Sequence, residues 1–175
     1  MRDNVKDKIR LYLRHRIPLL TTLILMFLFY VPINSLDLNY FRPAVGLICV
    51  YYWTLKRGYM FSYISAFIVG FFIDAYSSTP MGINCLMMML LVFLTEMLSR
   101  YFKSASFVSG WLFFLLVGIL LTFIKWLLIS ICFSYFVPIT EILINLMSTV
   151  LFYPLIAYIN IWIKKNLLPQ EHINE

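Results

Sequence analysis

The sequence predicts an all-α integral membrane protein in which six transmembrane helices form one bundle, with the N- and C-termini in the cytoplasm. Three observations lead to this fold class. First, 62% of the 175 residues are hydrophobic and only 13% are charged, whereas a water-soluble domain carries about 25% charged residues. Second, the chain holds six apolar runs separated by short polar connections. Third, the basic residues gather in alternate connections, as they do in multi-pass membrane proteins.

The six predicted spans follow from the apolar runs, because a helix needs about 20 apolar residues to cross the hydrocarbon core of a bilayer. The second run is short, whereas the fifth and sixth are long enough to tilt. The spans cover residues 17–33, 43–55, 59–74, 80–98, 109–133 and 139–163. They form a single membrane domain, 17–163, flanked by a basic segment, 1–16, and a tail, 164–175.

The first run follows a basic segment, as the core of a signal peptide would. It is long for a signal core and no A-x-A cleavage site follows it, so we expect a retained signal-anchor helix. In residues 3–16 apolar side chains recur at helical spacing among the basic ones. Two interpretations stay open: a short amphipathic helix on the anionic inner leaflet, or a charged tail that only orients the first span.

The placement of charge predicts the orientation. Twelve of the fourteen Lys and Arg residues fall in the segments expected in the cytoplasm, one (Arg42) falls in an outer loop, and one (Lys125) lies within a span. The cytoplasmic segments are 1–16, 56–58, 99–108 and 164–175. This bias predicts that both termini are cytoplasmic. It also accounts for the net charge of +6, so nucleic-acid binding is not expected.

Few side chains in the predicted spans could carry out catalysis. Both histidines, His15 and His172, lie in the tails, which argues against a Ser–His hydrolase and against an H-E-x-x-H zinc site. Cys49, Cys85 and Cys132 lie in apolar runs without a CxxC partner, so we expect spectator thiols. We therefore expect no enzymatic activity, no metal and no cofactor.

An acid, Asp74, ends the third apolar run, where the helix macrodipole disfavours a negative charge. The next helix has its own capping candidates, Ser78 or Thr79, with Pro80 at its first position. We therefore expect Asp74 to pair with a cation elsewhere. Counting outward along the second and third spans puts Arg42 at nearly the same depth, which predicts an Arg42–Asp74 pair at the outer mouth of this hairpin. A cation from a partner protein is the alternative.

Two further charged residues lie at membrane depth. Lys125, in the outer half of the fifth span, either snorkels toward the surface beside Trp126 or pairs with Asp74 or Glu141 inside the bundle. Glu141 opens the sixth span, where an acid suits the N-terminus of a helix.

Small residues recur at every fourth position of the third span. They are Gly58, Ser62, Ala66 and Gly70. Such a row lets another helix approach closely, because packing drives association between helices in lipid. We expect a partner helix to pack near the second to fourth spans.

Several features between residues 42 and 92 occur in a fixed order. An Arg-Pro pair opens the second span, a Tyr-Trp pair lies near its end, an A-F-x-x-G-x-x-x-D run follows, and a glycine comes eight residues later. In this chain they are Arg42, Pro43, Tyr52, Trp53, Ala66, Phe67, Gly70, Asp74 and Gly82. This segment resembles the MreD family of rod shape-determining proteins. The rest of the chain is similar in topology only, so Lys125 and Glu141 have no counterpart in that pattern.

The resemblance implies a non-enzymatic scaffold of the cell-elongation machinery in the bacterial inner membrane. Its implied partners are the single-span coiled-coil protein MreC and, through MreC, the MreB filaments, the RodA glycosyltransferase and its penicillin-binding transpeptidase, besides membrane lipid. The family is also similar in fold to the substrate-binding component of vitamin (ECF-type) transporters. The alternative function is therefore a small-solute transport component, which needs a pocket lined by polar groups such as Lys125, Asn145 and Thr122.

Overall fold

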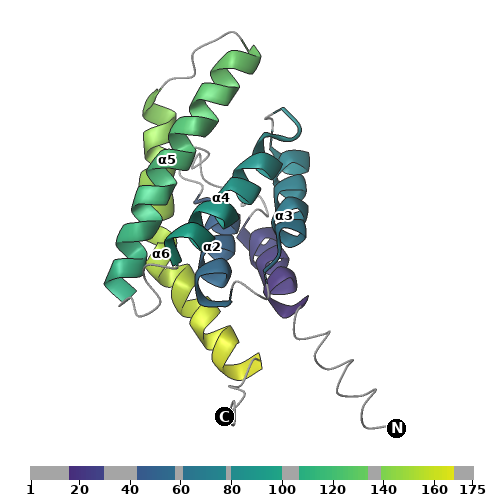
Figure 1. Ribbon diagram of the computed structural model, residues 1–175, viewed down its shortest axis with the longest axis vertical. Coiled ribbons are helices and arrows are strands. Elements are labelled where there is room, and N and C mark those ends of the chain that lie inside the picture. The colour runs from purple at the N-terminus through teal and green to yellow at the C-terminus, as the bar shows by residue number, and fades with distance from the viewer. Residues whose placement is uncertain are drawn as a thin grey trace, which may run out of the picture.

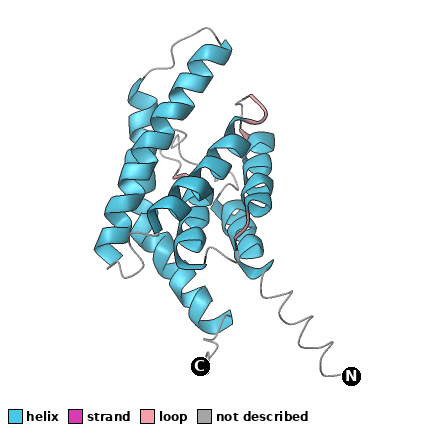
Figure 2. Cartoon of the chain, viewed as in Figure 1, coloured by secondary structure: helices cyan, strands magenta, loops and turns pink. Residues whose placement is uncertain are grey.

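The structure, a computed structural model, describes residues 16–29, 43–57, 61–77, 80–99, 107–133 and 139–167. These ranges hold six helices and no strand (Figure 2). The elements are an N-terminal helix (Arg16–Phe29), α2 (Val45–Arg57), α3 (Tyr63–Tyr76), α4 (Ile83–Ser99), α5 (Phe107–Phe133) and α6 (Ile139–Leu167). The all-α prediction is confirmed. The predicted amphipathic segment 3–16 lies almost wholly outside the described residues, and Arg42 lies outside them.

Helices α5 and α6 are long and apolar enough to cross a membrane. They lie side by side along one edge of the molecule, and the shorter α3 and α4 form a hairpin at the opposite edge (Figure 1). Helix α2 lies between these two pairs and contacts α3, α4 and α6. The N-terminal helix also packs on α2, where the Met26 side chain lies against Gly46.

Helix α2 is the centre of the core because it is apolar nearly all round, a pattern typical of a helix enclosed by others. Residues 48–53 are all buried. Tyr51 packs edge-on against Phe114 of α5 at 5.2 Å between ring centroids, and Phe114 stacks on Tyr153 of α6 at 4.6 Å. At the start of α2, the Ala44 N–H donates to Oγ1 of Thr149 in α6 at 3.0 Å. Aromatic packing and this cap therefore attach α2 to the long helix pair.

The outer faces of the helices are covered with large apolar side chains. Examples from α3 to α6 are Ile64, Phe72, Phe93, Leu116, Ile131, Leu151 and Trp162. Apolar surface of this extent would be unfavourable in water, since monomeric soluble proteins rarely expose large contiguous patches. It costs nothing against lipid, provided that the backbone polar groups are satisfied within helices.

Helix boundaries differ from the predicted spans where a polar group ends a helix. The third helix begins at Tyr63 rather than residue 59, because Ser62 has extended backbone and its Oγ accepts from Ser65 N–H at 3.5 Å. The fourth begins at Ile83 rather than Pro80. The φ angle of Gly82 is +105°, which no α-helical residue adopts.

Helices α5 and α6 are joined by a hydrogen bond at a proline. Pro154 lies inside α6 and has no N–H, so the Val150 carbonyl loses its intrahelical donor. The indole Nε1–H of Trp111 in α5 donates to this carbonyl at 3.2 Å. A side chain of one helix thus satisfies a backbone group of the other.

We expect Trp111→Phe to lower the free energy of unfolding by about 1 kcal/mol, because the Val150 carbonyl then has no donor. In a Pro154→Ala background the same substitution should cost clearly less, since residue 154 would then supply the N–H itself. Unfolding titrations of the four proteins in detergent micelles measure this coupling. Equal costs in both backgrounds would show that the indole does not serve the orphaned carbonyl.

Candidate functional site

The densest group of polar contacts in the described residues surrounds the carboxylate of Asp74, which is only 5% exposed. Its Oδ2 accepts from the N–H groups of Gly82 at 2.9 Å and Cys85 at 3.3 Å. Its Oδ1 accepts from the backbone N–H of Asn84 at 3.1 Å and from the Asn84 side-chain amide at 2.9 Å. Three of these donors belong to the start of α4, where N–H groups have no intrahelical acceptor. Asp74 of α3 therefore caps α4.

The connection between α3 and α4 is shaped so that these N–H groups face the carboxylate. Helix α3 ends at Tyr76, and Ser77 adopts extended backbone. Gly82, at φ +105°, turns the chain back just before α4. Glycine adopts this φ without the strain that a Cβ would add. The backbone conformation of Gly82 thus directs its own N–H and the N–H groups that follow toward Asp74, which explains why a glycine occurs at this position.

Gly70 allows α3 and α4 to approach closely enough for this cap. A Cβ on Gly70 would lie 2.5 Å from Cα of Cys85 and 2.8 Å from the Asn84 carbonyl oxygen, both backbone atoms. Cys85 in turn donates its Sγ–H to the Phe67 carbonyl at 3.8 Å. One member of the row of small residues, Gly70, thus meets α4 of the same chain, whereas Gly58 lies outside the described residues.

Asn84 connects Asp74 to Lys125. Its amide Nδ2 donates to Asp74 and to Oγ of Ser77 at 3.2 Å, whereas its Oδ1 accepts from Nζ of Lys125 at 2.9 Å. The lysine lies on α5, so one amide joins three helices. We call Asp74, Ser77, Asn84 and Lys125 the hairpin polar cluster.

Asp74 is therefore satisfied by N–H donors at the start of α4 rather than by a cation in direct contact. We expected a cation to satisfy Asp74 because Ser78 or Thr79 could cap the next helix. In the structure the positive end of the α4 macrodipole and the N–H groups of that helix stabilise the carboxylate. Lys125 does not snorkel outward, and it reaches Asp74 through Asn84 rather than directly. The Arg42–Asp74 pair stays a prediction, because Arg42 lies outside the described residues.

The hairpin polar cluster is built to hold three helices together in a low-dielectric setting. Its one acid and one base are of opposite charge, and the carboxylate oxygens face N–H donors of the protein. No group of three His, Cys, Asp or Glu side chains that could hold a metal occurs in the part of the chain that the structure describes. The hydrogen bonds of this cluster link α3, α4 and α5.

We expect Lys125→Met to lower the free energy of unfolding by about 1 kcal/mol, because Oδ1 of Asn84 loses this donor. In an Asn84→Leu background the same change should be neutral or stabilising, since a lysine left without that acceptor costs more than a methionine. The two costs are compared by unfolding titrations in micelles. If Lys125→Met cost the same free energy in the natural protein and in the Asn84→Leu protein, Lys125 would not act through Asn84.

The comparison with known protein families agrees with this arrangement. The sequence model of one family, described as rod shape-determining protein MreD, matches residues 9–161, which is most of the chain. The chain belongs to the MreD family. Searches of curated proteins and of solved structures return no match. The similarity in fold to vitamin-transporter components therefore stays a prediction.

Membership of the MreD family places the chain in a group of membrane proteins with a structural role in rod shape, not in an enzyme family. Of the family features quoted above, the structure brings three together: Gly70, Asp74 and Gly82 all serve the α3–α4 hairpin. Sequence spacing alone did not reveal that these three residues meet at the backbone of the start of α4.

The other predicted site residues of this MreD-family chain lie in several places. Tyr52, Trp53 and Ala66 are buried, so a partner could not touch them on the folded chain. The Tyr52 and Trp53 rings pack edge-on at 5.5 Å. Ser62 and Phe67 are exposed, and the Pro43 carbonyl accepts from Val45 N–H at 2.9 Å. Glu141 belongs to α6, and its side chain lies outside what the structure describes.

Several residues that take part in interhelical bonds were not predicted as site residues, and Asn84 and Tyr51 are two examples. Asn84 is a polar residue at the start of an apolar run, ten positions after Asp74, and that combination is the signal that could have found it. Tyr51 donates its hydroxyl to the Gly110 carbonyl at 2.9 Å. Its position beside Tyr52 and Trp53 gave no hint that its hydroxyl would bond to the backbone of α5.

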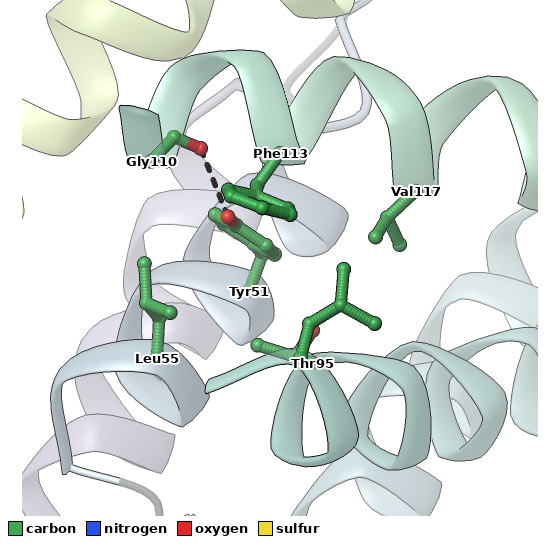
Figure 3. Close-up of a pocket in the computed structure, with 7 residues that line it drawn as sticks. Tyr51, Leu55, Thr95, Gly110, Phe113 and Val117 are labelled. Atoms are coloured by element: carbon green, nitrogen blue, oxygen red, sulfur yellow. Dashed lines mark hydrogen bonds between the residues drawn. The ribbon is translucent and has the colours of Figure 1, made fainter. Parts of the chain in front are cut away.

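A cavity between α2, α4 and α5 bears on the transport alternative (Figure 3). Figure 3 shows Tyr51 and Leu55 of α2 and Thr95 of α4 facing Phe113 and Val117 of α5. Its volume available to water centres is about 10 Å³, enough for roughly one water molecule. A vitamin-sized ligand needs about 300 Å³ or more. The Tyr51 hydroxyl and that of Thr95 already donate to backbone carbonyls, so this cavity does not support solute binding.

Proposed function

We propose that this protein is a non-enzymatic scaffold of the bacterial cytoplasmic membrane that helps to maintain rod shape. In this proposal six helices cross the membrane and both termini are cytoplasmic. The observation that carries the role is the match of the MreD family over residues 9–161. The apolar outer faces, the two long helices and the concentration of basic residues in alternate connections support the multi-pass arrangement.

The structure of the hairpin polar cluster supports a scaffold rather than a chemical role. Asp74 and Lys125 are two of the charged residues expected at membrane depth in the outer half of the bundle, and both contact groups of the same chain. A buried charge that is satisfied internally specifies how helices associate. We infer that the cluster keeps α3, α4 and α5 in one rigid arrangement on which partner helices dock.

The proposed partner is an MreC-like single-span coiled-coil protein. Through it the scaffold would reach MreB filaments, the RodA glycosyltransferase and its penicillin-binding transpeptidase. Family membership supports this proposal. The proposed surface is made of transmembrane helices, because the sequence leaves only short connections between the predicted spans and the outer faces of the helices are exposed.

Depletion of the protein in its native bacterium tests the role. We expect rod-shaped cells to become round and to be restored by the unsubstituted gene. Cells that keep their rod shape and elongate normally after full depletion would contradict the proposal.

Capture of the tagged protein from solubilised membranes separates the two functional classes. Recovery of a single-span coiled-coil protein supports the scaffold, whereas recovery of an ATPase module, or of a bound small solute, supports the transport alternative. A tagged, unrelated six-span protein expressed at the same level is the control for non-specific capture.

A further inference from the structure

Helix lengths differ greatly between the two edges of the bundle. Helix α3 has 14 residues and α4 has 17, which correspond to about 21 and 26 Å. Helices α5 and α6 have 27 and 29 residues, or about 41 and 44 Å. The hydrocarbon core of a typical bilayer is about 30 Å thick. The helices of the α3–α4 edge are therefore shorter than a hydrocarbon core of ordinary thickness, and those of the α5–α6 edge are longer than it.

The short length of α3 is fixed by caps at both ends. Ser62 and Ser77 both have extended backbone, so the helix cannot be longer than Tyr63–Tyr76. The two end residues are exposed tyrosines, a residue type enriched at membrane–water interfaces. They lie 13 residues apart, or about 20 Å along the helix. Tilting the helix would shorten this distance across the membrane still further.

Polar groups on α4 define the same two edges. The Tyr63 hydroxyl donates to Oε2 of Glu96 at 2.7 Å, near the end of α4. Near its start, Asn84 belongs to the hairpin polar cluster. Asn84 and Glu96 are 12 residues apart, or about 18 Å. A carboxylate in hydrocarbon is costly, so Glu96 keeps one edge of the apolar band at the interface.

Between these edges the outer surface of α3 and α4 is apolar. Its exposed large side chains are Ile64, Phe67, Phe71, Phe72, Leu86, Met89 and Phe93. On α5, by contrast, exposed apolar side chains run from Phe107 to Ile131, 24 residues or about 36 Å. The same protein therefore presents a short apolar band at one edge and a full-height band at the other.

We propose that the α3–α4 face is a binding surface for lipids of short acyl chains, next to which the bilayer thins to about 20 Å. Lipids at the α5–α6 face keep ordinary thickness. Thinning is the usual response of a bilayer to a protein whose apolar band is too short. The inference rests on the proposed placement of both helix pairs across the membrane and is independent of any role in cell shape.

The test compares lipids at the two edges of the purified, full-length protein. Phe71→Trp on α3 and Leu120→Trp on α5 introduce reporters at sites of matched exposure, 43% and 41%. Each variant is placed in vesicles of dimyristoyl phosphatidylcholine mixed equally with a brominated C18 phosphatidylcholine, whose bromines quench tryptophan. The signal of the four native tryptophans is subtracted with the unsubstituted protein.

We expect quenching at position 71 to be about half of that at position 120, because short chains gather at the α3–α4 face. In a control mixture of brominated and plain C18 lipids, where thickness offers no choice, both positions should be quenched equally. Equal quenching at both positions in the mixed-length vesicles would overturn the proposal. Phe67→Trp, also on the outer face of α3, replaces Phe71→Trp if that variant does not fold.

A second variant tests the cause. Glu96→Leu removes the charge that keeps one edge of the apolar band at the interface. The difference in tryptophan quenching between positions 71 and 120 should therefore become smaller. An unchanged difference would show that Glu96 does not set the thickness. The measurement uses isolated protein in vesicles, so its failure leaves the role in rod shape standing, and a failed depletion experiment leaves the lipid result standing.

Discussion

Replacing Asp74 with alanine is expected to lower the free energy of unfolding by roughly 3 kcal/mol or more. Four donors now satisfied by the carboxylate would lose their acceptor: three N–H groups at the start of α4 and the amide of Asn84. Hydrogen bonds to a charged group contribute about 1.5–3 kcal/mol each, and removing one member of a buried charged network costs about 3–5 kcal/mol. Lys125 would also lose the negative charge beyond Asn84.

Unfolding titrations in micelles measure this loss, and Glu96→Ala is the matched control. Glu96 is an acid on the same hairpin, but its Oε2 accepts from an exposed tyrosine hydroxyl. Removing such a surface interaction should cost no more than about 1 kcal/mol. If the two alanine variants were equally stable, Asp74 would not be capping α4. Asp74→Asn should fall between alanine and the natural residue, because its amide keeps one oxygen acceptor.

Replacing Gly70 with alanine is expected to destabilise the protein, although alanine has a higher helix propensity than glycine. Alanine favours an exposed helix over glycine by about 1 kcal/mol. At Gly70, however, the new Cβ would lie 2.5 Å from Cα of Cys85. Backbone cannot rotate out of the way as a side chain can, so α3 and α4 must separate. Overpacking of this kind costs about 1–3 kcal/mol, and separation also lengthens the bonds to Asp74.

Gly118→Ala is the control for this prediction. Its Cβ would meet only Cδ1 of Leu146 at 3.4 Å, the far end of a flexible side chain. We expect this variant to be as stable as the natural protein or slightly more stable. A Gly70→Ala protein that is also unchanged or stabilised would contradict the close α3–α4 contact. In the native bacterium, Gly70→Ala should restore rod shape poorly and Gly118→Ala fully.

The sequence predicted the all-helical fold and its six helices because composition carries this information in a strongly apolar chain. A backbone in hydrocarbon must satisfy its own hydrogen bonds, so long apolar runs have to be helices. The six apolar runs and the six described helices correspond one to one. Boundaries were less accurate. The helix beginning at Ile83 could not be placed from residue preferences, since Pro80 is a good first helical residue and the reason for the later start is the φ of Gly82.

The sequence singled out Asp74 as a residue of the candidate site, but it did not show which groups Asp74 contacts. An acid in an apolar chain must be satisfied by something, which singled out Asp74. Whether a cation or N–H groups satisfy it depends on which helix end lies beside it, and that is set by the packing of α3 on α4. Asn84 was missed for the same reason, because its amide matters only where α5 brings Lys125 within 2.9 Å.

By itself the sequence determined that this chain is helical and strongly apolar, and that it resembles rod shape-determining proteins. These properties depend on sums over many residues or on spacing along the chain. They can therefore be predicted without knowing which segments lie side by side in the fold. Only the tertiary structure decided that Gly70, Asp74 and Gly82 act together. Hydrogen bonds and steric contacts depend on ångström distances between segments, and no local pattern encodes those distances.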